Sequence, residues 1–548
     1  MIPILKFALK KCLFILLLLS AIACEQSGEK KIMFPPTDLT DANLIPKPLK
    51  ISATHSAFNL NESTIIFTSK TGTGFDKIGN FLAKEIKAKT DLTLSINAKQ
   101  TKKRIPNIFI EQVENMELNS KEGYKLTISK DSVVLSAKTS EGAFRGIQTL
   151  TQLIPETSND TLATYEMWLL PTGQITDEPN FEYRGFMLDV ARHFFSVDEL
   201  KKQIDILAYY KINILHLHLT DDQGWRIEIK SWPKLTEIGS LSEVGGGKGG
   251  FYTQEDYKEL VAYCAERYIT VIPEIDMPGH TNAASVSYPV LNGNAKNLKQ
   301  LKNMDGGVSS IDIDLKPYTG TEVGFSTFDA NKDVVYEFID DVVKEITAIT
   351  PGPYFHIGGD ESHVTKKKDY IHFVNKLEKI VQKYGKRMIG WDEITQASIG
   401  STTIAQHWEK DENAIKAAKK GLKIILSPAK KAYLDMKYDT LSKFGLHWAA
   451  YIPVDTAYNW IPETYFNEVP KESILGIEAP LWSETISNND ELEYLAYPRL
   501  LGYAELGWST KENLNWEDYR KRLAAQKQYF DRMHIKYYPS ELIDWDKD

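Results

Sequence analysis

The chain has 548 residues, of which 42% are hydrophobic and 25% charged, a balance typical of a folded protein with a large buried core. A chain of this length is expected to form two or more domains. Its formal net charge is −9 at pH 7. Binding to nucleic acid needs clustered Lys and Arg that displace counterions, so this acidic balance excludes nucleic acid as a partner.

The N-terminus predicts export and attachment to a membrane. Residues 1–23 combine three lysines with an apolar run from Cys12 to Ala23, which is too short to form a stable transmembrane helix. Ala21-Ile22-Ala23-Cys24 resembles a bacterial lipobox, with Ala21 where that pattern prefers Leu, and the resemblance implies lipidation of Cys24. Ordinary secretion with cleavage nearby is the alternative. We therefore expect an exported bacterial lipoprotein, periplasmic or anchored in the outer membrane through Cys24.

Removal of the signal has two consequences. The loss of its three lysines changes the net charge from −9 to −12. Of the three cysteines, Cys12 leaves with the signal and Cys24 would be acylated, so only Cys264 remains free. A disulfide framework and a cysteine-based metal site are both excluded.

A tether and a small domain follow. The segment after Cys24 is polar, and residues 24–44 are expected to form a flexible tether. Residues 45–178 predict an α+β accessory domain with a hairpin around Lys130-Asp131, and the absence of a reactive cluster there indicates a scaffold. Its predicted strands are Ser63–Thr68, Asn107–Gln112, Tyr124–Ser129 and Ser132–Ala137, and its predicted helices are Phe75–Lys89 and Ser140–Leu153.

Residues 179–548 predict an α/β domain, a (β/α)8 TIM barrel with a C-terminal helix, because strands and helices alternate there. A full helix does not fit between Trp391 and Thr402, and none is clear between Ser427 and Ile474, so one side is expected to be irregular. The predicted strands are Gly185–Val190, Asn213–Leu219, Thr270–Ile275, Pro353–Ile357, Arg387–Trp391, Thr402–Gln406, Leu422–Ser427 and Ile474–Ala479; the helices are Val197–Tyr210, Gln254–Arg267, Asn331–Ile349, Asp369–Tyr384 and Ala414–Lys420.

Polar and aromatic residues recur at the carboxyl ends of these strands, where barrel enzymes assemble their sites. Random surface polarity would not favour the same end of consecutive strands. In chain order the residues are Asp189, Arg192 and His193; Asp221 and Asp222; Glu274, Asp276 and His280; Asp360 and Glu361; Trp391 and Asp392; Trp408; Tyr433 and Asp435; and Trp482 and Glu484.

The adjacent carboxylates Asp360 and Glu361 follow an apolar strand and the pair Gly358-Gly359, a pattern that predicts a buried strand ending in an active site. The alternative is structural. Asp360 could cap the next helix, with Glu361 as an acid in its first turn.

Six motifs resemble those of family 20 glycoside hydrolases, the β-N-acetylhexosaminidases, and the resemblance covers most of the mature chain. The acid/base motif is His356-Ile357-Gly358-Gly359-Asp360-Glu361, and the others are Arg184-Gly185-Phe186-Met187-Leu188-Asp189-Val190-Ala191-Arg192-His193-Phe194, His216-Leu217-His218-Leu219-Thr220-Asp221-Asp222-Gln223-Gly224-Trp225-Arg226, Pro273-Glu274-Ile275-Asp276-Met277-Pro278-Gly279-His280, Gly390-Trp391-Asp392-Glu393-Ile394 and Ala479-Pro480-Leu481-Trp482-Ser483-Glu484.

The resemblance implies a retaining exo-β-N-acetylhexosaminidase without a cofactor, which removes terminal β-linked N-acetylglucosamine or N-acetylgalactosamine from glycans. This family is an exception to the two-carboxylate rule, because the substrate's own 2-acetamido oxygen attacks the anomeric carbon and forms an oxazolinium intermediate. The implied catalytic residues are Asp360, which holds the acetamido N–H, Glu361, the acid and base, and Tyr433, which donates to the acetamido oxygen; the implied substrate-binding residues are Arg192, Asp221, His280, Trp391, Trp408, Asp435, Trp482 and Glu484.

Several alternatives stay open. A relative that releases a disaccharide (lacto-N-biosidase) or a 6-sulfated N-acetylglucosamine would differ in its loops, and residues 292–324 and 437–469 are expected to form that rim. A surface lipoprotein that binds glycans without turnover is a third possibility. Asp221 and His280 are expected to orient Glu361 rather than to react. His216 and His218, with Asp221 and Asp222, could suggest a metal, but a core role on one strand face is favoured.

Overall fold

The computed structural model describes residues 37–69, 74–97, 106–156, 168–293 and 316–546. The expected export signal, Cys24 and most of the expected tether lie outside these ranges. The folded part begins before Ile45, because the side chains of Leu39 and Leu44 are already buried in the hydrophobic core. The expectation of a flexible tether up to residue 44 is therefore wrong at its C-terminal end.

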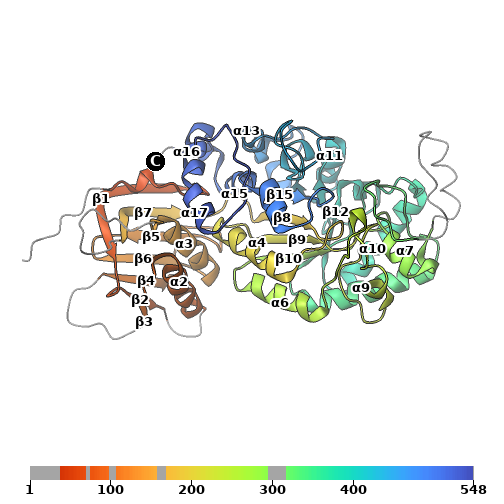
Figure 1. Ribbon diagram of the computed structural model, residues 1–548, viewed down its shortest axis with the longest axis horizontal. Coiled ribbons are helices and arrows are strands. Elements are labelled where there is room, and N and C mark those ends of the chain that lie inside the picture. The colour runs from red at the N-terminus through yellow and green to blue at the C-terminus, as the bar shows by residue number, and fades with distance from the viewer. Residues whose placement is uncertain (1–36, 70–73, 98–105, 157–167, 294–315, 547–548) are drawn as a thin grey trace, which may run out of the picture.

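The accessory domain is a seven-stranded mixed sheet in the order β1-β7-β5-β6-β4-β2-β3, with α2 and α3 on one face (Figure 1). The sequence analysis missed β1, β3 and β7. β1 is buried only near its C-terminal end, and it pairs only with β7, over 100 residues away, in an antiparallel register that places Lys50 opposite Thr176. The elements are β1 (Lys50–Leu60), β2 (Ile65–Thr68), α2 (Phe75–Thr90), β3 (Ser95–Ile96), β4 (Asn107–Gln112), β5 (Tyr124–Ile128), β6 (Ser132–Ala137), α3 (Ser140–Leu153) and β7 (Trp168–Asp177).

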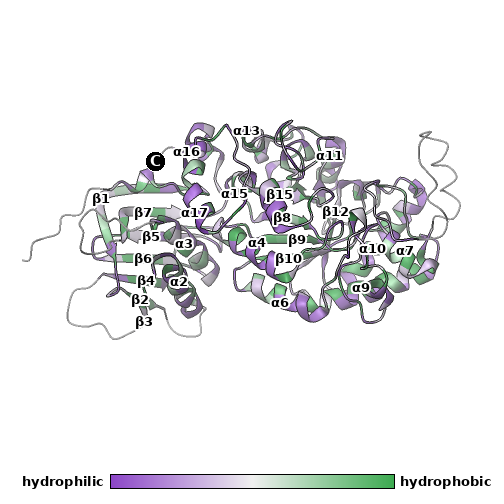
Figure 2. Cartoon of the chain, in the orientation of Figure 1, coloured by the Kyte–Doolittle hydropathy of each residue, from purple (hydrophilic) through white to green (hydrophobic). Residues whose placement is uncertain are grey.

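The second domain is a closed barrel of eight parallel strands, as predicted, and β15 closes it by pairing with β8. Figure 2 shows hydrophobic residues along the strands and hydrophilic residues on the outward faces of helices such as α6 and α9. The strands are β8 (Tyr183–Asp189), β9 (Ile214–His218), β10 (Thr270–Glu274), β11 (Tyr354–His356), β12 (Arg387–Trp391), β13 (Ile404–His407), β14 (Lys423–Leu426) and β15 (Ile474–Leu481); the longer helices are α4 (Val197–Tyr209), α6 (Gln254–Ala265), α9 (Asp333–Ile349), α10 (Lys367–Lys383), α11 (Asp411–Lys419), α14 (Asn489–Ala496) and α15 (Arg499–Trp508).

The barrel is irregular on the predicted side. A short 3-10 helix, Asp392–Gln396, stands where a helix would follow β12. Between β14 and β15 the chain forms only α12 (Ala429–Ala432), α13 (Val454–Tyr458) and two 3-10 turns. The long connection after β14 is therefore free to bring side chains over the barrel mouth.

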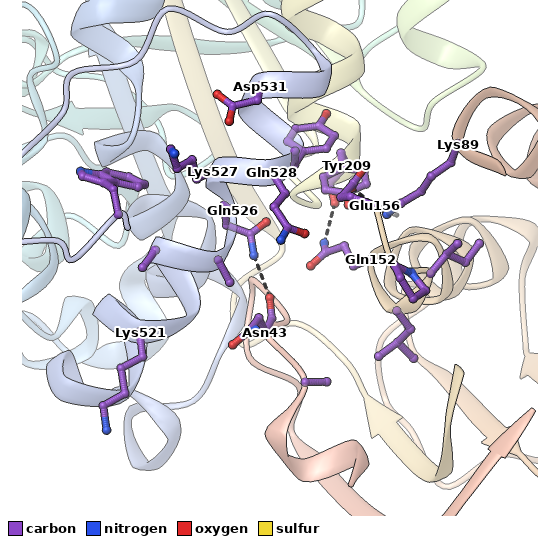
Figure 3. Close-up of a pocket in the computed structure, with 18 of the residues that line it drawn as sticks. Asn43, Lys89, Gln152, Glu156, Tyr209, Lys521, Gln526, Lys527, Gln528 and Asp531 are labelled. Atoms are coloured by element: carbon purple, nitrogen blue, oxygen red, sulfur yellow. Dashed lines mark hydrogen bonds and ion pairs between the residues drawn. The ribbon is translucent and has the colours of Figure 1, made fainter. Parts of the chain in front are cut away.

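The two domains meet in a polar junction. A crevice of about 840 Å³ lies between the accessory domain and the C-terminal helices α16 (Trp516–Ala525) and α17 (Lys527–Arg532), and Gln526 donates across it to the carbonyl of Asn43 at 2.8 Å (Figure 3). Elsewhere in the junction, Glu122 of the accessory domain pairs with Arg184 of β8 at 2.5 Å and, within its own domain, with Arg145 of α3 at 2.8 Å. The buried Glu122–Arg184 pair thus holds the accessory domain against the barrel.

Candidate active site

Asp360 and Glu361 lie just beyond the carboxyl end of β11, after a backbone segment whose conformation favours glycine at positions 358 and 359. Gly358 and Gly359 have φ angles of 64° and 99°, and a Cβ on Gly358 would stand 1.9 Å from Oδ1 of Asp276. The N–H of Gly359 donates to the same oxygen at 3.0 Å. Glu361 itself has a φ of 42°, a left-handed conformation that is strained for a side chain of this kind and is found most often at functional sites.

The helix-capping alternative for this pair is wrong. The following helix, α10, begins at Lys367, and its N-cap residue is Lys366. Asp360 and Glu361 are thus several residues short of the helix and free to face the barrel mouth.

Glu361 carries the electrostatic character of an acid. Burial and the neighbouring charge of Asp360 raise its pKa, the cation of His280 lowers it, and the balance gives a pKa of about 7. Nε2 of His280 lies 3.6 Å from Oε2 of Glu361 and 3.9 Å from Oδ2 of Asp360. A carboxyl group with a pKa near neutrality can both donate and accept a proton at physiological pH.

Asp221 lies behind His280, where the sequence analysis expected it. Its Oδ1 is 3.1 Å from Nδ1 of His280, and its Oδ2 is 2.8 Å from Nη2 of Arg192 and 2.9 Å from Nε2 of His218. Burial alone would lower the pKa of His280, but Asp221 and nearby carboxylates outweigh it and raise that pKa well above its usual value. His280 therefore stands as a cation beside Glu361.

Several predicted site residues share an unusual property: they carry buried polar atoms that have no hydrogen-bond partner among the described residues. Buried polar groups are normally paired, so a set of unpaired atoms around one mouth indicates a site for a polar ligand. The atoms are Nε of Arg192, Nε2 of His280, Oδ1 of Asp360, Oδ1 of Asp435 and Oε2 of Glu484.

Asp435 and Glu484 form the far side of this set. Burial raises the pKa of Asp435 well above its usual value, and the charge of Glu484 raises it further. Burial also raises the pKa of Glu484, against the lowering effect of Arg192. These two neighbouring buried carboxyl groups, with the guanidinium of Arg192 near Glu484, offer the donors and acceptors that sugar hydroxyls need.

Aromatic rings surround the mouth. The ring of Tyr433 lies 6.4 Å from that of Trp408, 6.3 Å from that of Trp482 and 6.0 Å from that of Trp448. Trp391 was expected to bind the substrate directly. It has no exposed surface, however, and its ring lies behind that of Trp482, with the ring centroids 5.8 Å apart. It supports the wall from beneath.

Sequence reasoning missed Trp448, and it named Glu393 only as part of the motif Gly390-Trp391-Asp392-Glu393-Ile394, without a role in the site. Trp448 is 55% exposed and stands over Trp408 at 6.1 Å, although it comes from the long connection after β14. Glu393 accepts a hydrogen bond from the indole of Trp408 at 3.1 Å. A Trp in a loop without a strand end beside it offers no local signal, whereas Glu393 follows the strand-end pair Trp391-Asp392 and could have been considered.

The histidines of β9 occupy the barrel core, as expected. Nδ1 of His216 lies 2.9 Å from Oε1 of Glu478, and Nδ1 of His218 lies 2.7 Å from Oε2 of Glu274. Groups such as His216, Glu274 and His356 come within 4.8 Å of one another, a spacing that a metal could use. Each of these imidazoles faces a buried carboxylate, an arrangement that suits the role in the core that the sequence favoured.

Comparison with known proteins agrees with this geometry. The catalytic-domain model of glycosyl hydrolase family 20 matches residues 181–511, and the model of domain 2 of that family matches residues 41–178. A β-N-acetylhexosaminidase from Cellulomonas fimi is 38% identical over 427 residues, which cover 77% of this chain and 82% of that protein. A β-hexosaminidase from Porphyromonas gingivalis is 36% identical over 551 residues, covering 95% of this chain and 67% of that protein.

Solved structures of the same family also superpose on this chain. The β-N-acetylhexosaminidase from Streptomyces coelicolor superposes with a TM-score of 0.84 at 40% identity and covers 93% of this chain and 100% of that chain. A mutant β-hexosaminidase from Streptomyces plicatus, in complex with its product GlcNAc, gives a TM-score of 0.83 at 40% identity, with 93% and 98% covered. The chain therefore belongs to glycosyl hydrolase family 20 and is a β-N-acetylhexosaminidase.

Proposed function

We propose that the enzyme is a retaining exo-β-N-acetylhexosaminidase that removes terminal β-linked N-acetylglucosamine or N-acetylgalactosamine from glycans by substrate-assisted catalysis. The observation that carries the proposal is the pair of adjacent carboxylates. Asp360 and Glu361 both approach the same nitrogen of His280, at 3.9 and 3.6 Å. This arrangement suits one acid and one supporting anion that act from the same side of the sugar, with the nucleophile supplied by the substrate.

In the first step the 2-acetamido oxygen attacks the anomeric carbon, and the bond to the leaving oxygen breaks as Glu361 gives that oxygen its proton. Asp360 accepts a hydrogen bond from the acetamido N–H and stabilises the positive charge of the oxazolinium, and the hydroxyl of Tyr433 donates a hydrogen bond to the acetamido oxygen. In the second step water attacks the anomeric carbon and the carboxylate of Glu361 takes a proton from the water, while the bond from that carbon to the acetamido oxygen breaks and the acetamido group is restored. Two inversions at one carbon give net retention.

The buried polar groups on one side of the site support cleavage of the terminal sugar of a glycan. Arg192, Asp435 and Glu484 carry unpaired buried atoms there and would bind the hydroxyls of the terminal sugar. Trp448 stands on the open side, where it would contact the sugar that leaves. This division of enclosed and open sides favours single-sugar release over release of a disaccharide.

The test is a panel of aryl glycosides that share one leaving group. N-Acetylglucosaminide and N-acetylgalactosaminide should be hydrolysed, whereas the glucoside, which lacks the acetamido nucleophile, should be nearly inert even at saturation. Glucoside turnover at a comparable rate, or a covalent glycosyl ester on any Asp or Glu, would overturn the substrate-assisted mechanism. A sulfated analogue and a disaccharide substrate in the same panel decide between the specificities within the family.

We further propose that the enzyme is exported and held at a membrane by a lipid on Cys24. The support is the sequence at the N-terminus, an apolar run followed by a lipobox-like motif. Within the part of the chain that the structure describes, no helix is long and apolar enough to cross a bilayer. Attachment through lipid would leave the barrel mouth free to meet glycans.

A further inference from the structure

A buried carboxylate, Glu274, lies at the end of β10 beneath the site, and its two oxygens face different neighbours. The indole N–H of Trp391 donates to Oε1 at 3.0 Å. Nδ1 of His218 lies 2.7 Å from Oε2. The nitrogens of two further histidines approach the same carboxylate, His356 on the Oε1 side at 2.9 Å and His216 on the Oε2 side at 3.1 Å. Glu274 thus meets the side chains of three other strands.

The contact through Oε1 leads to the aromatic wall. Trp391 lies against Trp482 at 5.8 Å, and Trp482 lies 6.3 Å from Tyr433 and 5.0 Å below the guanidinium of Arg192. Trp391 has no exposed surface of its own. Its orientation, set by the bond to Glu274, therefore determines where the exposed part of the wall stands.

The contact through Oε2 leads to the acid. The other nitrogen of His218 lies 2.9 Å from Oδ2 of Asp221, whose Oδ1 lies 3.1 Å from His280. His280 in turn lies 3.6 Å from Glu361. A continuous chain of charged and hydrogen-bonded groups thus connects Glu274 to the group that transfers the proton.

We propose that Glu274 is a positioning residue that couples the two halves of the site, since one oxygen orients the wall of the acetamido pocket and the other orients the His218–Asp221–His280 chain behind the acid. The inference rests on the proposed function. The inference goes further than that function, because it assigns a role in catalysis to Glu274. This side chain is fully buried, so no substrate atom reaches it.

The chemistry of the carboxylate makes the inference testable with a substitution of equal size. A carboxylate accepts hydrogen bonds on both oxygens, whereas an amide accepts on its oxygen and donates from its nitrogen. In Glu274→Gln an amide nitrogen that faces Trp391 cannot accept from the indole, and one that faces His218 must donate to Nδ1, which then carries no proton, so one of the two contacts changes whichever way the amide is oriented. The volume of the side chain is unchanged, so packing in the barrel core is preserved.

The same barrel layer offers a matched control. Glu478 of β15 is also fully buried and also accepts contacts from a histidine, with His216 at 2.9 Å, and from Gln406 at 2.7 Å. Its partner His216 also lies 3.1 Å from Glu274, and the ring of His216 lies 6.4 Å from that of Trp391, so among the described residues Glu478 connects to the site only through this one side chain. Glu478→Gln therefore introduces the same buried amide without removing an acceptor from Trp391 or His218.

The experiment compares the two variants by kcat, by KM and by the inhibition constant of a cyclic thiazoline that mimics the oxazolinium. Glu274→Gln should lower kcat by about 100-fold and weaken the thiazoline, because sub-ångström misplacement of reacting groups has effects of this order. Glu478→Gln should leave both within about twofold of the parent. Equal losses in the two variants at equal melting temperature would overturn the inference, as would a Glu274→Gln variant with parental kinetics.

Two further variants keep the inference falsifiable if Glu274→Gln does not fold. Trp391→Phe removes the indole N–H together with part of the ring that lies against Trp482, and it should weaken the thiazoline more than it alters the pH profile. His218→Gln removes the imidazole between Glu274 and Asp221, whose ring also lies 5.0 Å from that of Trp482, and it should alter the pH profile more than it weakens the thiazoline. Identical responses of these two variants would contradict two separate contacts. If the proposed function is wrong, the variant Glu361→Gln should lose the same share of its activity on substrates with good and with poor leaving groups. That result does not depend on Glu274, so the two proposals can fail separately.

Discussion

The carboxyl group of Glu361 lies 3.6 Å from the imidazole of His280, and the opposite nitrogen of that imidazole lies 3.1 Å from Asp221. The acid thus has a cationic neighbour whose charge is held in place by a buried anion. This relationship lowers the pKa of Glu361 against the raising effects of burial and of Asp360. The pH range in which the enzyme works should depend on it.

The first prediction concerns pH. Glu361 must be protonated to act as an acid, and its pKa is about 7, so kcat/KM should fall as pH rises through that value. In His280→Gln the cation is removed, the pKa of Glu361 rises further, and the falling limb should move to higher pH while kcat drops. Rates measured from pH 4 to 10 on one substrate check this. A limb that stays in place or moves to lower pH would contradict the assignment.

The second prediction concerns the leaving group. Glu361→Gln should fold normally and lose about 10²–10⁴-fold in kcat on natural glycans, whose leaving groups need a proton. Aryl glycosides with acidic leaving groups should lose less in the first step, since they depart without protonation. A series of substituted phenols, with rates plotted against phenol pKa, measures the difference. The same loss at every leaving-group pKa would argue against Glu361 as the acid.

The third prediction concerns the charged intermediate. Asp360→Asn should lower kcat by about 10²–10³-fold, because the neutral amide stabilises the developing oxazolinium charge less well. The inhibition constant of the thiazoline should rise in parallel, since this inhibitor resembles the intermediate. Steady-state kinetics and inhibitor titration on the same preparation provide both values. Slower turnover without weaker inhibition would point to a different role for Asp360.

The fourth prediction concerns Trp448, which is 55% exposed beside Trp408 and Tyr433. Trp448→Ala should raise KM for N-acetylglucosamine oligosaccharides about tenfold, a loss of about 1.4 kcal/mol, because the leaving sugar would lose its aromatic contact. A methyl glycoside, whose leaving group is too small to reach the ring, serves as the control and should be little affected. Equal changes for both substrates would assign Trp448 to the terminal-sugar pocket instead.

The fifth prediction concerns attachment. Cys24→Ala should release a soluble protein from the membrane fraction with unchanged specific activity, because the lipid would be joined outside the folded domains. Fractionation with immunodetection, together with metabolic labelling by a fatty acid, measures the outcome. Persistent partition of the variant with membranes would show that another feature anchors the chain.

The barrel and the main reactive groups could be read from the chain because both are local signals. Short apolar runs alternating with amphipathic helices indicate parallel strands, and the polar residues at the end of each run meet at one rim when the sheet closes. Asp360, Glu361, Asp221 and His280 were predicted in this way, and each of the three carboxylates lies within 4 Å of the imidazole of His280. The sequence also predicted that no long helix forms near residues 392–401 and 428–473, because it shows no extended helical periodicity there.

The tertiary structure alone decided features that depend on distant contacts. β1 is a strand only because β7 lies beside it, over 100 residues further along the chain. Trp448 reaches the pocket from an irregular loop, and Trp391 lies behind the wall instead of in it. The two oxygens of Glu274 meet side chains of different strands. Sequence by itself determined which chemistry stands at the strand ends, whereas the closure of the barrel decided which of those groups touch, because burial and pairing arise only between segments that the fold brings together.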